Sequence, residues 1–267
     1  MGLLHVEGAR ELSQAEIAYE AIAPVYDEFT AHYDTEAWLS DLLPHLERCG
    51  LSGNRLLDVG CGTGESFIPM LARDWQVTGC DISPAMLARA RAKVGEAASL
   101  SVADMRDLPQ LGSFDLVWAL DDAINYLLSL EELEAALSGM RENLAPGGLV
   151  MFDVNTLLVY RTFFAERNVV ERDGKRMVWN GQADKSVEAG SICEALFGVE
   201  GDSTEASPHV HRQRHFPEAE VLAALASAGL KPLAVLGHGL DGVPKQSLDE
   251  SSHTKAVYIA CAVPIEA

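Results

Sequence analysis

Five short apolar runs alternate with helical stretches between residues 56 and 153, and this alternation constrains the fold more than any other feature. The runs lie at 56–60, 76–80, 99–103, 114–120 and 148–153. Strands separated by helices form right-handed β-α-β units, whose parallel sheet is covered on both faces. Helix-start signals agree with this order, because Ser83 precedes a proline and Ser129 opens a capping box with Glu132. The sequence therefore predicts an α/β fold.

The segments on either side of this region have different patterns. Residues 11–48 have helical periodicity, whereas 167–216 consists of short alternating segments separated by turn signals such as Asp173-Gly174. A helix at 217–228 and strands near 233–238 and 255–262 follow. We expect a helical lid at 1–50, a core at 51–160 and 217–267, and a small antiparallel cap inserted after the fifth strand at 161–216.

The charge of the chain limits its partners. Forty acidic residues against 20 basic ones give a formal net charge of −20, which repels nucleic acid and anionic lipid. There is no run of the roughly 20 apolar residues that a membrane-spanning helix needs. We expect a cytoplasmic protein that binds neither nucleic acid nor membranes. The sequence leaves open whether two copies of the chain form a homodimer. The chain has five scattered cysteines, and no two of them form a C-x-x-C motif. We expect all five to be reduced.

The segment LLDVGCGTGES at 56–66 places three glycines directly after the first predicted strand. Glycines at a strand end permit a tight turn and let the backbone approach a ligand closely. The spacing is G-x-G-x-G with Asp58 two positions before the first glycine, whereas nicotinamide enzymes carry G-x-G-x-x-G. A nicotinamide oxidoreductase is therefore the weaker alternative for this loop.

Acidic residues follow the second and third predicted strands. Asp81 can accept hydrogen bonds from both hydroxyls of a ribose, or it can cap the helix that begins at Ser83. Asp104 can take an adenine amine while the Met105 backbone reads the ring, or it can cap a turn. We therefore expect Asp81 and Asp104 to contact a bound nucleoside.

These motifs together resemble the class I S-adenosylmethionine-dependent methyltransferases. The segments DVGCGTG, DISPAML, ADM, FDLVWAL and LAPGGLVMFD match the family's consecutive motifs in order over roughly 55–153. The resemblance implies a Rossmann-like fold with a mostly parallel, seven-stranded sheet. It also implies S-adenosylmethionine as the cofactor and S-adenosylhomocysteine as the product.

The resemblance further implies a set of cofactor-binding residues. The glycines would hold the methionine part, Asp81 the ribose, Ile82 and Met86 the adenine face, and Asp104 with Met105 the adenine edge. The core positions implied are Asp58, Gly60, Cys61, Gly62, Gly64, Ser66, Asp81, Ile82, Met86, Asp104, Met105 and Leu120.

The N-terminal segment APVYDEF at 23–29 resembles the lid of the small-molecule branch of this family. That branch includes amino-sugar N-methyltransferases of antibiotic pathways and glycine N-methyltransferase. The resemblance implies that Tyr26, Tyr33 and Trp38 close over the cofactor. The alternative is that these aromatic side chains only pack within the lid.

Candidates for the acceptor side follow the fourth predicted strand, at DDAINY in 121–126. We expect Asp122 to face the acceptor and include Tyr126 beside it, although an aspartate here could instead cap the next helix. The segment lacks the N-P-P-Y type motif of many nucleic-acid methyltransferases. It also lacks the histidine that sugar N-methyltransferases carry in this region.

A histidine-rich run at 209–216 supplies further candidates. If the run is a strand, His209, His211, Gln213 and His215 lie on one face. We expect this cap strand to close over the acceptor, with His211 or His215 as hydrogen-bond partner or general base. The alternatives are a solvated face, or a zinc site at His209 and His211.

From these features we expect methyl transfer from S-adenosylmethionine to an oxygen or nitrogen of a small metabolite, in secondary metabolism such as antibiotic biosynthesis. Two alternatives are a cofactor-binding protein that does not methylate and a macromolecular methyltransferase. Metal-dependent chemistry would need converging ligands, for which only Asp122, Asn125 and Asp153 are candidates, and we expect no metal.

Overall fold

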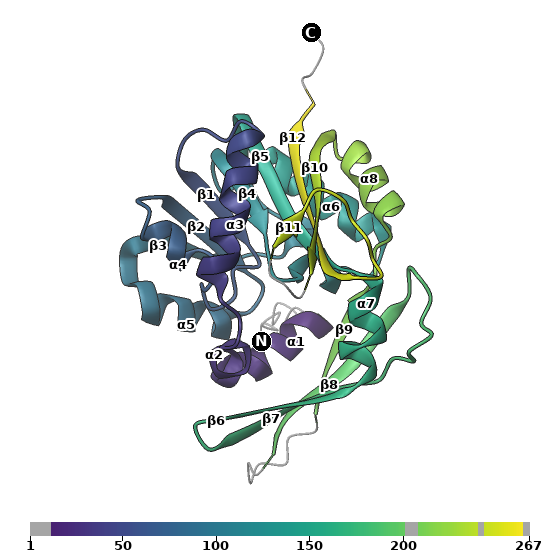
Figure 1. Ribbon diagram of the computed structural model, residues 1–267. Helices are drawn as coiled ribbons and strands as arrows, with labels where there is room; N and C mark the ends of the chain where they lie inside the picture. The colour runs from purple at the N-terminus through teal and green to yellow at the C-terminus, as the bar shows by residue number, and fades with distance from the viewer. Residues whose placement is uncertain (1–11, 201–207, 240–242, 264–267) are drawn as a thin grey trace, which may run out of the picture.

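The computed structural model describes residues 12–200, 208–239 and 243–263. Its centre is an eight-stranded sheet with spatial order β11-β10-β12-β5-β4-β1-β2-β3 (Figure 1). The strands of this sheet are β1 (Arg55–Val59), β2 (Gln76–Asp81), β3 (Ala98–Val102), β4 (Phe114–Ala119), β5 (Leu144–Asn155), β10 (Leu230–Gly239), β11 (Pro244–Lys245) and β12 (His253–Ala262). Strands β1 to β5 pair in parallel, and β12 runs antiparallel to both β5 and β10.

Helices cover both faces of this sheet. The helices of the described chain are α1 (Gln14–Ile22), α2 (Tyr26–Thr30), α3 (Thr35–Arg48), α4 (Ile68–Leu71), α5 (Pro84–Val94), α6 (Leu130–Glu142), α7 (Leu157–Arg161) and α8 (Glu218–Ser227), with short 3₁₀ turns η1 (Ala23–Val25), η2 (Gly95–Ala97), η3 (Met105–Asp107), η4 (Ala123–Tyr126) and η5 (Phe163–Ala165). Buried side chains of α6 and α8, such as Leu137 and Leu225, join the core on one face. Those of α3 and α5, such as Leu42 and Leu87, join the core on the other.

The predicted α/β class with a mostly parallel sheet is confirmed, but the predicted number of seven strands is wrong. The eighth strand is β11, which pairs with β10 through Gly237 and His238. It contains only two residues, so no alternating pattern could have predicted it. The predicted helix starts are confirmed, because Ser83 Oγ accepts the Met86 N–H at 3.1 Å and Ser129 Oγ accepts the Glu132 N–H at 3.2 Å.

A second, four-stranded antiparallel sheet lies between α7 and α8 in the sequence and below the large sheet in Figure 1. Its strands in spatial order are β6 (Arg167–Arg172), β7 (Lys175–Gly181), β8 (Ile192–Glu200) and β9 (His209–Arg214). This sheet corresponds to the cap expected at 161–216, of which residues 201–207 lie outside the described chain.

The first helices lie between the two sheets (Figure 1). Ile22 and Phe29 share one buried cluster with Trp179 and Phe197 of the small sheet. In contrast, α3 packs on the large sheet through Leu39, Leu42 and Leu46. The segment expected to form one lid at 1–50 therefore packs on two different partners, and its first 11 residues lie outside the described chain.

None of the helices within the described ranges is long and apolar enough to cross a membrane. None of the five cysteines, all within the described residues, is paired in a disulfide.

Candidate active site

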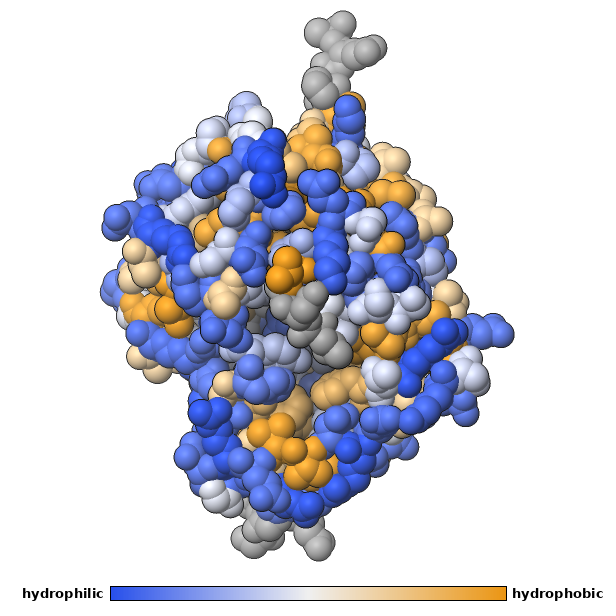
Figure 2. Space-filling model, in the orientation of Figure 1, coloured by the Kyte–Doolittle hydropathy of each residue, from blue (hydrophilic) through white to orange (hydrophobic). Residues whose placement is uncertain are grey.

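A cavity of about 1610 Å³ opens at the carboxyl ends of the parallel strands, between the large sheet, the first helices and the small sheet. Figure 2 shows the corresponding hollow between the core and the small sheet, with apolar surface on the small-sheet side. In open α/β sheets, ligands bind at this edge. Pockets for a single ligand usually measure roughly 300–1,000 Å³, so this cavity can hold two ligands.

The glycine loop forms one wall of the cavity. Gly60, Gly62 and Gly64 have φ angles of +74°, +53° and +90°, which side chains other than glycine rarely adopt. A Cβ at Gly60 would lie 3.1 Å from the Ala123 Cβ. The loop is held from behind, because Ser66 Oγ donates to the buried Asp58 carboxylate at 2.5 Å. Burial raises the pKa of Asp58 to about 7.

Asp81 lies at the end of β2 and also lines the cavity. Its carboxylate accepts the N–H groups of Gly62 and Ser83, each at 2.8 Å. The contact to Ser83 is the capping role weighed above, and the contact to Gly62 joins the acidic residue to the glycine loop. Because a carboxylate offers about four lone-pair sites, two bonds leave capacity for ligand hydroxyls.

Asp104 follows β3 at the same edge. Its carboxylate accepts the Arg106 backbone N–H at 3.0 Å and also contacts the Arg106 guanidinium, with the shortest distance at 2.6 Å. The turn-capping role is therefore present. The side chain is still part of the cavity wall together with Met105.

Side chains of the first helices join them to this wall. Asp27 accepts the Thr63 hydroxyl at 2.5 Å and the Lys93 ammonium at 2.9 Å. Glu20 accepts the Ser83 hydroxyl at 2.7 Å and the Ala85 N–H at 2.9 Å. These bonds hold the aromatic side chains Tyr19 and Tyr26 against the cavity.

At the end of the cavity where β4, β5 and β12 meet, three carboxylates surround one ammonium group. Lys255 Nζ lies 3.1 Å from Asp121, 3.2 Å from Asp122 and 2.7 Å from Asp153. The Asp153 carboxylate also accepts the backbone N–H groups of Asp121 (2.6 Å) and Asp122 (3.0 Å). Asp121 and Asp122 both have left-handed φ angles, of 59° and 55°. The contacts to Asp153 and Lys255 hold this loop in its uncommon conformation.

Asp122 precedes the turn η4, but its side chain makes no capping hydrogen bond to it, unlike the alternative considered from the sequence. Its second oxygen accepts the Gln213 side-chain amide of β9 at 2.5 Å. Loss of hydration raises the pKa of Asp122 to about 6, although the Lys255 ammonium acts in the opposite direction. Burial alone would lower the pKa of Lys255, but the surrounding carboxylates, Asp153 foremost, raise it well above its ordinary value.

Tyr126 and His211 complete this end of the cavity. The Tyr126 hydroxyl and His211 Nδ1 are 2.8 Å apart, and Tyr19 packs against both rings. Burial lowers the pKa of His211 to about 3, so its imidazole is neutral at neutral pH. The tertiary structure therefore brings a histidine to a segment whose own sequence lacks one.

His215 lies elsewhere. It is buried, its Nδ1 accepts the Gly190 N–H at 3.1 Å, and its Nε2 lies 3.0 Å from Glu250. It does not belong to the cavity wall. Residues 209–216 were considered as a single strand from the sequence. In the structure β9 ends at Arg214, and the chain turns toward α8 beyond it. The structure thus separates His215 from the other acceptor-side candidates.

We expect His215→Ala to destabilise the fold by about 2–3 kcal/mol, because it leaves the Gly190 N–H without its partner and creates a cavity. Turnover should stay within about twofold, since the side chain lies outside the site. Urea unfolding and steady-state kinetics measure the two effects. His209→Ala on the same strand is the control, and a large loss of turnover in His215→Ala with intact stability would contradict this placement.

Most sequence candidates line the cavity. They are Tyr26, Tyr33, Trp38, Gly60, Cys61, Gly62, Ser66, Asp81, Ile82, Met86, Asp104, Met105, Leu120, Asp122, Tyr126 and His211. Asp58, Gly64 and His215 do not; Asp58 supports the loop from behind through Ser66, and Gly64 is the last glycine of the loop. A Cβ at Gly64 would lie 2.7 Å from the Phe67 ring.

Sequence reasoning missed several residues of the cavity. Tyr19 lies in α1, whereas Tyr26 begins α2, and its aromatic side chain close before the recognised segment was the only signal that could have revealed it. Lys255 is a single charged residue at the start of a predicted apolar strand, and this was the only local sign that it has a role in the cavity. Gln213 was placed on the same strand face as the histidines but was given no role, whereas Asn155 and Trp179 gave no signal that distinguished them from packing residues.

Lys255 gives a prediction about pH dependence. In Lys255→Met, the ammonium that lowers the pKa of Asp122 is absent, so this pKa should rise further above 6. If ionised Asp122 is needed, the acidic limb of the activity profile should move to higher pH by about 1–3 units. A kcat/KM profile measures this. Lys255→Arg retains the charge and should keep the limb in place, and an unmoved limb in a folded Lys255→Met protein would exclude the coupling.

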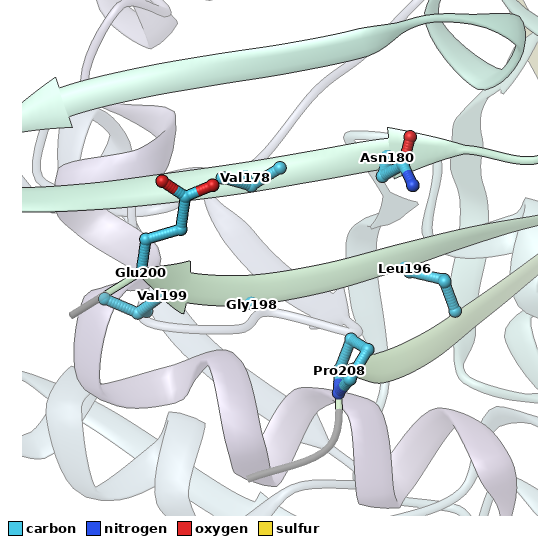
Figure 3. A pocket seen from close by; sticks show the side chains of 7 residues that line it. All are labelled: Val178, Asn180, Leu196, Gly198, Val199, Glu200 and Pro208. Atoms are coloured by element: carbon cyan, nitrogen blue, oxygen red, sulfur yellow. The ribbon is translucent and has the colours of Figure 1, made fainter. Parts of the chain in front are cut away.

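A smaller depression of about 190 Å³ lies on the other face of the small sheet (Figure 3). Val178, Leu196 and Pro208 line it, with Glu200 at one end. Glu200 is paired with Arg167 at 2.6 Å and also with Arg176. This depression holds no cluster of reactive groups, so the large cavity is the candidate active site.

The described residues contain no group of three or more histidine, cysteine, aspartate or glutamate side chains suited to a metal ion. At the place where Asp121, Asp122 and Asp153 converge, the Lys255 ammonium lies among them. His209 and His211, which were weighed as zinc ligands, do not form such a group either.

The parallel sheet, the glycine loop after β1 and the carboxylate after β2 define a Rossmann-like enzyme that binds a nucleoside cofactor. Comparison with known proteins identifies the family. Residues 56–148 match the family model described as a methyltransferase domain.

One relative is the dTDP-3-amino-3,4,6-trideoxy-alpha-D-glucopyranose N,N-dimethyltransferase of Streptomyces venezuelae. It is 32% identical over 78% of this chain and 90% of its own length. Two solved structures are similar. A methyltransferase from Clostridium acetobutylicum has a TM-score of 0.75 at 20% identity, covering 92% of this chain and 99% of its own. The sugar N-methyltransferase KedS8 from Streptoalloteichus has a TM-score of 0.65 at 25% identity, covering 99% and 98%.

The chain belongs to the S-adenosylmethionine-dependent methyltransferases. It is an enzyme whose cofactor is S-adenosylmethionine, as the sequence motifs indicated.

Proposed function

We propose that this enzyme methylates a nitrogen of a small aminated metabolite, within secondary metabolism. The observation that carries the proposal is the Asp122 carboxylate at the cavity end where β4, β5 and β12 meet, flanked by Lys255, Gln213 and the Tyr126–His211 pair. The Streptomyces venezuelae relative is named for N,N-dimethylation of an amino sugar, which supports a nitrogen acceptor.

The cofactor end of the cavity fits S-adenosylmethionine. Gly60 and Gly62 present backbone without side chains, and Asp81 retains hydrogen-bonding capacity beside them. We propose that Asp81 binds the ribose hydroxyls, that Met86 and Ile82 contact the adenine face, and that Asp104 and Met105 read its edge. Tyr26, Tyr33 and Trp38 would cover the ligand from the first helices.

The bound cofactor supplies an activated methyl group, which forms a C–N bond with the acceptor's lone pair while the C–S bond breaks and its electrons stay on sulfur. The chain's own residues must therefore position an amine and remove a proton from it. With a pKa of about 6, Asp122 is ionised at neutral pH and can accept that proton. Positioning and exclusion of water supply much of the remaining rate.

His211 is proposed as a hydrogen-bond partner of the acceptor. Its pKa of about 3 makes it a poor proton acceptor at neutral pH. Tyr126 orients the ring by bonding Nδ1, and Nε2 is buried without a hydrogen-bond partner.

A small acceptor is favoured over a macromolecule by two observations. The chain carries a net charge of −20, and the acceptor end is enclosed by the first helices and the small sheet. The homodimer and the cytoplasmic location stay predictions.

The test uses purified enzyme with methyl-deuterated S-adenosylmethionine and a panel of small amines and matched alcohols, including free amino sugars. Mass spectrometry detects the labelled methyl group, and we expect it on an amine. Asp81→Ala, which should lose cofactor binding, is the control. Labelled alcohols without labelled amines would refute the nitrogen acceptor, and cofactor binding without any product would favour a non-methylating role.

A further inference from the structure

The acceptor end of the cavity has an excess of negative charge. Asp121, Asp122 and Asp153 surround Lys255, so three carboxylates face one ammonium. An ammonium has three N–H donors, and each of these carboxylates lies within hydrogen-bond distance of it. Lys255 therefore has no donor left for an anionic ligand, and the group keeps a formal charge of −2.

The remaining cationic group of the wall is also neutralised. Among the described residues that line the cavity, Arg106 and Lys255 are the arginine and lysine side chains. Arg106 contacts the Asp104 carboxylate at 2.6 Å and the Glu132 carboxylate at 3.3 Å. A phosphate group is normally bound by such side chains or by a helix N-terminus.

The start of α3, which also lines the cavity, is occupied. Asp34 caps this helix by accepting the Ala37 N–H at 2.9 Å. The capping carboxylate supplies the negative charge that a phosphate would bring to a helix start. Neither cationic side chain of the described wall nor the start of α3 is thus positioned to hold a diphosphate.

Aromatic rings and buried polar atoms occupy the same end. The Tyr19 and Tyr126 ring centroids are 5.0 Å apart, and those of Trp179 and His211 are also 5.0 Å apart. His211 Nε2 is buried without a hydrogen-bond partner, in a residue that is 1% exposed. Aromatic faces next to carboxylates attract an ammonium group, and a buried imidazole nitrogen without a partner favours a polar atom beside it.

We infer that the acceptor enters as a small organic cation, an ammonium bound between Asp122 and the aromatic rings, and that it carries no phosphate in the part which the cavity encloses. The inference rests on the proposed methylation of an amine and names its substrate class. It separates this enzyme from relatives whose named acceptors are sugar nucleotides, such as the Streptomyces venezuelae enzyme.

The experiment measures binding of two probes to the enzyme saturated with S-adenosylhomocysteine. Tetramethylammonium chloride represents the cation, and thymidine diphosphate represents the anion. Thermal unfolding is recorded at constant ionic strength with sodium chloride as the reference. At about ten times its dissociation constant, a bound probe should raise the unfolding midpoint by about 2–4 °C.

We expect tetramethylammonium to raise the midpoint and thymidine diphosphate to leave it unchanged. Asp122→Asn should weaken tetramethylammonium binding by about tenfold or more, whereas Glu96→Gln, which removes an exposed charge outside the cavity, should not. Stabilisation by thymidine diphosphate, or no response to tetramethylammonium, would overturn the inference. Failure of the proposed function is distinguishable, because it would appear as absent methylation of amines in the labelling assay.

Discussion

Replacement of Asp81 by alanine is expected to weaken binding of S-adenosylmethionine by about 2–4 kcal/mol. The change removes charge-assisted hydrogen bonds and leaves ribose hydroxyls unpaired in a buried position. It also releases the Gly62 N–H, which lies 2.8 Å from this carboxylate, and so loosens the glycine loop. Isothermal titration calorimetry with S-adenosylmethionine measures the effect directly.

Two comparisons make this result specific. Asp81→Asn retains the shape and part of the hydrogen bonding, so its loss should be smaller than that of alanine. Circular dichroism and thermal unfolding establish whether each variant is folded. An unchanged dissociation constant in a folded Asp81→Ala protein would refute the assignment of Asp81 to the ribose.

The second large effect is expected for Asp122→Asn. Turnover should fall by about 10²-fold, because the amide keeps the size of the side chain but cannot accept a proton as a base. The dissociation constant of S-adenosylhomocysteine should change by less than about threefold, since the Asp122 carboxylate is bonded to Gln213 and Lys255 rather than to Asp81 or the glycine loop. Steady-state kinetics with the amine found by labelling, together with calorimetry, separate the two effects.

Asp121→Asn is the matched control. Both carboxylates contact Lys255, but the Asp121 side chain is 40% exposed and Asp122 is 24% exposed and bonds to Gln213. We expect Asp121→Asn to lower turnover far less. Equal losses in both variants would mean that the charge of the group matters rather than the position of Asp122, and full activity in Asp122→Asn would exclude its role as a base.

Much of the core could be predicted because its signals are local. The run at 56–66 contains both the β1 strand and the glycines that follow it, and Asp81 directly ends β2. Parallel strands place their carboxyl ends at one edge, so residues that follow different strands meet there without further information. The cofactor end of the cavity follows from this rule.

The acceptor end could not be predicted in the same way. Lys255 reaches Asp121, Asp122 and Asp153 because β12 runs antiparallel to β5, with Lys255 opposite Asn155. The start of β12 therefore lies at the edge where the parallel strands end. No pattern near residue 255 encodes that direction, which depends on how the whole sheet is completed.

The small sheet shows the same division. Alternation in 209–216 predicted a strand with His211 and His215 on one side, but only the packing of β9 against α1 and η4 decided which histidine reaches Tyr126. The sequence by itself determined the α/β class, the glycine loop and the acidic residue after β2, since these depend on neighbouring residues and on the direction of parallel strands. The tertiary structure alone decided the Lys255 cluster, the Tyr126–His211 pair and the separate place of His215, because these contacts join segments whose approach is set by long-range packing.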